Sequence, residues 1–71
     1  METQKKLGLI IRELRTKQNI SQEKLAELVG VHRTYIGMIE RGEKNITINT
    51  IEKIAKGLNI KVWKIFERID I

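Results

Sequence analysis

Residues 22–41, QEKLAELVGVHRTYIGMIER, hold two short amphipathic segments that meet at Gly30. In both segments apolar residues recur three or four positions apart, which is the spacing of a helix face that packs on a core. Ser21 precedes the first segment as a helix N-cap, and Gly30 with Val31 forms the turn that leads into the second. The stretch therefore predicts two consecutive helices joined by a short turn.

The helical spacing continues on both sides of this stretch. It predicts a first helix over about residues 4–18, which Asn19 can end in the left-handed conformation. A fourth helix follows the N-cap Thr47 and closes at Asn59, and a short fifth helix covers about residues 62–69. Alternation typical of strands occurs only in three-residue runs, which are too short to compete. We therefore expect one all-α domain of five helices over the whole chain.

The apolar stripes of the first four helices predict the core. Ala26 adds a small side chain at a point where another helix could approach closely. The larger residues expected to face the core are Leu7, Ile10, Ile11, Leu14, Leu25, Leu28, Val29, Ile36, Ile39, Ile48, Ile51, Ile54 and Leu58.

The composition narrows the classes of function. The 71 residues include no cysteine, which excludes disulfides and thiolate metal sites. The lone His32 has no nucleophile constellation beside it, and neither metal-ligand spacing nor a glycine-rich phosphate loop occurs. We expect no enzyme activity, no metal and no cofactor. The net charge of +5 favours an anionic partner, nucleic acid first, although solubility alone also accounts for such a charge.

Apolar runs are short throughout. None approaches the ~20 residues that cross a bilayer, and the one near the N-terminus is too short for a signal peptide. We therefore expect a cytoplasmic protein that does not contact a membrane.

The third helix, which follows His32 and ends at Gly42, has a side that its apolar stripe leaves free. At about 100° per residue, Ile36 and Ile39 point to the core while Tyr35 lies at the border. Arginine can bind guanine with two hydrogen bonds, and a threonine methyl can touch the thymine methyl. An ordinary solvated face is the alternative reading. The residues expected on the free side are Arg33, Thr34, Gly37, Met38 and Arg41.

The whole spacing of residues 22–41 resembles the helix-turn-helix of the phage repressor/Cro (Xre-like) family, and the resemblance extends over about residues 4–67. Within this family the sequence is most similar to restriction–modification controller proteins. The segments that carry this similarity are RTYI, the IERG ending and the N-I-T sequence before the fourth helix. The resemblance implies a five-helix, phage-repressor-like domain that binds double-stranded DNA. The positions that carry it are Gln22, Ala26, Gly30, Ile36, Ile39 and Glu40.

The resemblance also implies roles for individual residues. Arg15 and Glu40 match a structural ion pair between the first and third helices. Arg33, Thr34, Gly37 and Met38 match positions that read base edges. The residues implied to meet the DNA backbone are Gln22, His32, Tyr35, Arg41, Lys44 and Asn45.

Four of the backbone assignments leave alternatives open. Gln22 could be a solvated first-turn residue, and Arg41 a cation favoured at any helix end. Tyr35 suits either packing or a hydroxyl contact to phosphate. His32 is not a favoured capping residue, and it could contact phosphate or fill a surface corner.

The fifth segment carries more apolar residues than one face of two turns can bury. The family-like role of Ile65 and Phe66 is to fill the core, which leaves Trp63 and Ile69, with Leu9 of the first helix, as candidates for a dimer interface. Scattered exposed apolar residues are the alternative.

Together these features predict a homodimeric regulator. It would bind a near-palindromic operator, because two copies read half-sites one turn apart. An autoregulating restriction–modification controller is the specific form, with RNA polymerase as a further candidate partner. An antitoxin or adaptor whose main partner is another protein is the alternative.

Overall fold

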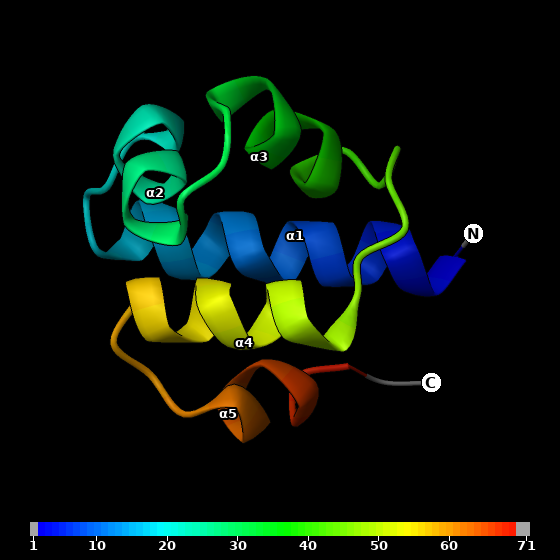
Figure 1. The fold of residues 1–71 in the computed structure, drawn as a ribbon. Coiled ribbons are helices and arrows are strands. Elements are labelled where there is room, and N and C mark those ends of the chain that lie inside the picture. The colour runs from blue at the N-terminus through cyan, green and yellow to red at the C-terminus, as the bar shows by residue number, and fades with distance from the viewer. Residues whose placement is uncertain (1, 70–71) are drawn as a thin grey trace.

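The computed structural model describes residues 2–69, which form five α-helices and contain no strand (Figure 1). The all-α prediction is therefore confirmed. The first helix begins two residues earlier than expected, and the fifth ends three residues earlier. The helices are α1 (Glu2–Lys17), α2 (Gln22–Val29), α3 (Arg33–Glu40), α4 (Ile48–Gly57) and α5 (Val62–Phe66).

Short-range signals in the sequence account for most of the helix ends. The hydroxyl of Ser21 accepts a hydrogen bond from the backbone N–H of Lys24 at 2.9 Å and caps α2. Thr47 caps α4 in the same way. Asn19 follows α1 in the left-handed conformation, as predicted. Gly30 ends α2 at φ +88°, a conformation that favours glycine, and so turns the chain toward α3.

Helix α1 packs against α3 and α5, and α4 packs between α2 and α5. Helix α3 lies against one side of α1, α5 against the other, and α2 packs on both α3 and α4 (Figure 1). Consequently α3 and α5 lie on opposite sides of the molecule. None of the helices in residues 2–69 combines the length and apolar character that a bilayer crossing requires.

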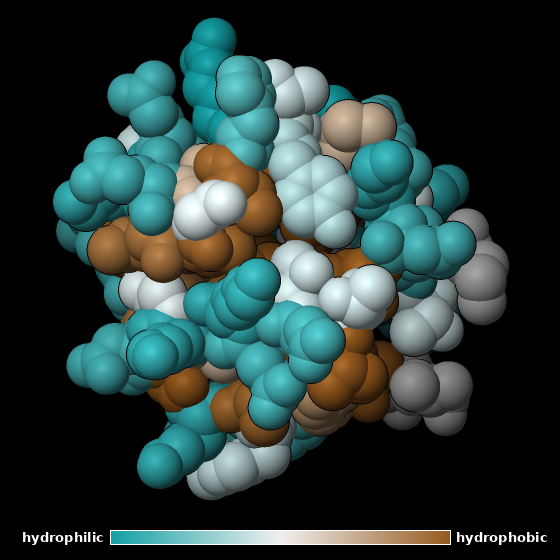
Figure 2. Space-filling view, viewed as in Figure 1, coloured by the Kyte–Doolittle hydropathy of each residue, from teal (hydrophilic) through white to brown (hydrophobic). Residues whose placement is uncertain are grey.

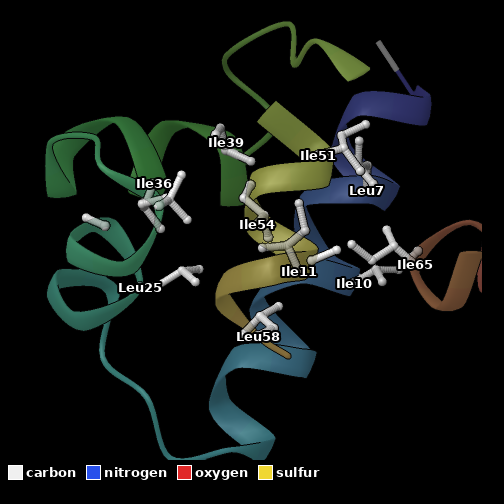
Figure 3. Close-up of a cluster of buried hydrophobic side chains, with 13 residues drawn as sticks. Leu7, Ile10, Ile11, Leu25, Ile36, Ile39, Ile51, Ile54, Leu58 and Ile65 are labelled. Atoms are coloured by element: carbon white, nitrogen blue, oxygen red, sulfur yellow. The ribbon is translucent and has the colours of Figure 1, made fainter. Parts of the chain in front are cut away.

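Side chains from all five helices converge on one hydrophobic core (Figure 3). Ile11, Leu25, Ile36, Ile54 and Ile65 are completely or almost completely inaccessible to solvent, and Ala26 lies among them as the small residue of α2. The other buried members are Leu7, Ile10, Val29, Ile39, Ile51, Ala55 and Leu58.

Three residues expected in the core are exposed instead. Ile48 is 63% exposed because it is the first residue of α4, and that helix reaches the core one turn later, at Ile51. Leu28 is 47% exposed, since the buried side of α2 is already occupied by its neighbours. Phe66 is 40% exposed because the brief α5 directs a single buried side chain, Ile65, into the core.

Candidate nucleic-acid interface

Helix α3 lies at an edge of the molecule, and the helices that pack against it, α1 and α2, touch its inner side (Figure 1). Arg33 and Thr34 in its first turn are exposed, and Met38 one turn later is half-buried. The residues described by the structure therefore leave the N-terminal part of the outer side of α3 open to a ligand.

The helical spacing predicts Gly37 on the open side of α3. This prediction is wrong, because Gly37 is buried in the structure. The cover is made by side chains rather than by another helix. A β-carbon built on Gly37 would lie 3.1 Å from Nη1 of Arg41 and 3.6 Å from Oε1 of Gln22. The absent side chain at this position thus provides room for the Arg41 guanidinium.

His32 caps α3 with its imidazole ring. Its Nδ1 accepts a hydrogen bond from the backbone N–H of Thr34 at 3.1 Å, with the His32 backbone extended. His32 therefore occupies the N-cap of α3, although histidine is not a favoured capping residue. The reason is that a neutral imidazole nitrogen carries a lone pair that can accept from the first turn of a helix.

Replacement of His32 by alanine is expected to lower the free energy of unfolding by about 1 kcal/mol, because one of the free N–H groups at the start of α3 loses its acceptor. His32→Ser is the matched control, since a serine hydroxyl can restore the cap. Urea denaturation of both variants measures the difference, and equal stability of the two would show that the cap contributes nothing.

The first turn of α2 is tied to the C-terminal end of α3 by a buried polar network. Nε and Nη2 of Arg15 donate to the two carboxylate oxygens of Glu40 at 2.7 and 3.0 Å. Nη1 of Arg15 also donates to the backbone oxygen of Ile20, and Nε2 of Gln22 donates to Glu40 at 3.0 Å. Arg15 and Glu40 thus join α1 to α3, and they orient the amide of Gln22.

Arg41 follows α3 and is exposed, and its guanidinium is bound by a carboxylate that the sequence analysis did not single out. Nε and Nη2 of Arg41 donate to Glu43 at 3.0 and 3.1 Å. These hydrogen bonds lower the pKa of the Glu43 carboxyl and raise the pKa of Arg41. The only signal in the sequence was an acidic residue two positions after the arginine.

The remaining candidates divide between the loop and the border of α3. Lys44 and Asn45 are exposed in the connection from α3 to α4. The ring of Tyr35 is half-buried and packs against the core. The geometry therefore brings Gln22, Arg41, Gly37 and Glu43 together at one end of α3, while Arg33, Thr34 and His32 occupy the other end.

Comparison with known proteins gives a consistent assignment. The helix-turn-helix family profile matches residues 11–62. Control protein C.SmaI of Serratia marcescens is 46% identical over 68 residues, spanning 96% of this chain and 81% of that protein. Control protein C.BamHI of Bacillus amyloliquefaciens is 49% identical over 55 residues, spanning 76% and 68%.

A solved structure gives the same result. The fold matches the crystal structure of the restriction-modification controller protein C.AhdI from Aeromonas hydrophila with a TM-score of 0.91 and 41% identity, covering 93% of this chain and all of that one. The chain therefore belongs to the helix-turn-helix family of DNA-binding transcription regulators, within the Xre-like group that includes the restriction–modification controller proteins.

Proposed function

We propose that this protein is a restriction–modification controller that binds a near-palindromic operator as a homodimer and regulates its own promoter. The observation that carries the proposal is the open outer side of α3, whose first turn exposes Arg33 and Thr34. The role is regulatory and not catalytic. A regulator bound at a promoter changes access of RNA polymerase, which is the further partner that this function implies, and it acts in the cytoplasm.

In this proposal α3 enters the major groove. Arg33 pairs with O6 and N7 of a guanine, the methyl group of Thr34 contacts a thymine, and Met38 supplies an apolar contact. Gly37 contributes indirectly, because its missing side chain admits the Arg41 guanidinium. The base-reading set is therefore Arg33, Thr34 and Met38, with Gly37 as the residue that shapes the surface beside them.

The backbone contacts flank this set. Gln22 begins α2, where unpaired N–H groups and the helix dipole attract a phosphate. One hydrogen of its amide is held by Glu40, so the other remains for the DNA. Arg41, Lys44 and Asn45 lie beyond the C-terminal end of α3 and would meet the sugar-phosphate backbone there. His32 and Tyr35 are assigned to further contacts with the sugar-phosphate backbone, at the start of α3.

Substitution of Arg33 by alanine is expected to weaken operator binding by about 1–3 kcal/mol and to relax the preference at one base position. The operator is first identified by selection of purified protein on a random duplex library, and affinity is then measured by fluorescence anisotropy. Arg68→Ala is the matched control, because it removes an equal charge from the α5 side of the molecule. If the wild-type protein preferred no duplex in the selection, the proposed function would be wrong.

The dimer surface is assigned to the opposite side of the molecule from α3. Trp63 is 56% exposed and Leu9 is 54% exposed, although both are large apolar residues. Ile69 is half-buried and, with Phe66, lines an apolar hollow of about 260 Å³ beside α1 and α4. Figure 2 shows one face of the molecule, on which apolar side chains lie among hydrophilic ones. Leu9, Trp63 and Ile69 remain our candidates for the contact between two copies.

Trp63→Ala is expected to raise the dissociation constant of the dimer by about tenfold or more, because buried tryptophans contribute strongly at interfaces. Sedimentation equilibrium measures this constant. Leu28→Ala, which truncates an exposed apolar residue of α2, is the control and should leave the constant unchanged. A monomeric wild-type protein at all concentrations would remove the dimer from the proposal.

A further inference from the structure

The guanidinium of Arg41 is already occupied in the protein without DNA. Its Nε and Nη2 form two parallel hydrogen bonds with the carboxylate of Glu43, at 3.0 and 3.1 Å. This is the bidentate geometry in which arginine also binds a phosphate. Both side chains remain more than half exposed, at 57% and 51%. The pair is therefore on the surface and accessible to a ligand.

The position of the guanidinium is defined on its other side by α3 and α2. Nη1 of Arg41 lies where it would be 3.1 Å from a β-carbon at Gly37. Oε1 of Gln22 lies beside the same point, at 3.6 Å. Glu43 thus holds Arg41 against the α3 surface, next to the residue proposed to bind a phosphate at the start of α2.

We propose that Glu43 is an intramolecular substitute for a DNA phosphate, which occupies Arg41 in the free protein and must be displaced when the operator binds. This inference rests on the proposed function, because it requires Arg41 to contact the DNA backbone. Glu43 then sets the affinity of the protein by competition, without touching DNA itself.

Two physical arguments support the competition. The hydrogen bonds from Arg41 lower the pKa of the Glu43 carboxyl, so the carboxylate is ionised at neutral pH and available to compete. In addition, an exposed ion pair is only weakly stabilising, so a phosphate in the duplex can replace it. The expected size of the effect is therefore modest, about two- to fivefold in affinity.

The exchange also has a consequence for the salt dependence. When Arg41 neutralises a phosphate, counterions leave the DNA, which contributes up to about 0.9 to the slope of log affinity against log salt. The carboxylate of Glu43, once released, takes up cations and offsets this gain. Removal of the carboxylate should therefore make the slope steeper by up to about 0.9.

The test is a double-mutant cycle with Glu43→Gln, Arg41→Ala and the double variant, in the full-length protein on the selected operator. We expect Glu43→Gln to tighten binding about two- to fivefold and to steepen the salt slope, and Arg41→Ala to weaken binding. In the Arg41→Ala background the gain from Glu43→Gln should fall by at least half, because no guanidinium remains to be released.

Glu13→Gln is the matched control for loss of one negative charge. Glu13 is an exposed carboxylate that pairs with Arg68 beyond α5, on the side away from α3. It should produce less than half of the gain. An equal gain from Glu13→Gln, or an undiminished gain without Arg41, would mean that general repulsion explains the effect and would overturn the inference.

Two further outcomes separate this inference from the proposed function. Weaker binding by Glu43→Gln would show that the carboxylate positions Arg41 rather than competing for it, and would overturn the inference while the operator and the role of Arg33 stand. Unchanged binding by Arg41→Ala would show that Arg41 does not contact DNA, and this would also overturn the inference. Absence of any preferred duplex would instead defeat the proposed function.

Discussion

Glu40→Gln is expected to lower the free energy of unfolding by about 3–5 kcal/mol. Both oxygens of the Glu40 carboxylate are bound, by Nε and Nη2 of Arg15 and by the amide of Gln22. Arg15 and Glu40 are both buried, so neutralising the carboxylate leaves a charged guanidinium with neither solvent nor counter-ion. A domain of this length is stabilised by roughly 4–11 kcal/mol in total, and the variant should therefore be largely unfolded on mild heating.

Urea denaturation followed by circular dichroism measures this loss. Glu13→Gln removes a carboxylate from an exposed ion pair and should leave the unfolding midpoint close to that of the wild type. Removal of both buried charges, by Arg15→Met with Glu40→Leu, should recover much of the stability because no uncompensated charge remains. A single Glu40→Gln variant as stable as the wild type would contradict the role of the pair.

Gly8→Ala is expected to destabilise the protein by about 3 kcal/mol, at the upper end of the usual range for overpacking. A β-carbon at this position would lie 2.4 Å from the backbone oxygen of Ile39 and 2.6 Å from that of Glu40. Both atoms belong to the backbone of α3, so no rotamer change relieves the clash and α1 must move away from α3. This displacement outweighs the ~1 kcal/mol that alanine adds within a helix.

Gly37→Ala is the matched control for this prediction. Its β-carbon would meet the guanidinium of Arg41 at 3.1 Å, which is the mobile end of an exposed side chain and can shift. The variant should therefore gain up to about 1 kcal/mol of stability from helix propensity, and thermal unfolding of both variants compares the two. If Gly8→Ala were as stable as Gly37→Ala, the close approach of α1 and α3 would be refuted.

Much of the fold follows from short-range features. Ser21 and Thr47 cap their helices because the hydroxyl reaches an N–H three residues later. Gly30 and Asn19 end helices because they tolerate the left-handed conformation. These interactions lie within a few residues of one another along the chain, so a local pattern is enough to predict them.

The predictions of burial were wrong where burial depends on the position of a neighbouring helix. The spacing correctly assigned Ile48 to the apolar stripe of α4, but it did not show that the core begins one turn later. Similarly, Phe66 is exposed because α5 is short and buries only Ile65. Leu28 is exposed because it lies outside the group of residues that α2 buries. Periodicity predicts which residues share a face, but not how far the neighbouring surface extends.

The amino-acid pattern is enough to predict the five helices, the turn at Gly30 and the family to which the chain belongs. It also predicted an outer side of α3 bearing Arg33 and Thr34, which follows from the helical period. Three features become visible only in the packed molecule. Gly8 must lack a side chain, Glu40 orients Gln22, and Arg41 lies over Gly37 with its guanidinium hydrogen-bonded to Glu43. The reason is physical: these contacts join atoms that lie on different helices or past a helix end, and their distances exist only once the helices have packed.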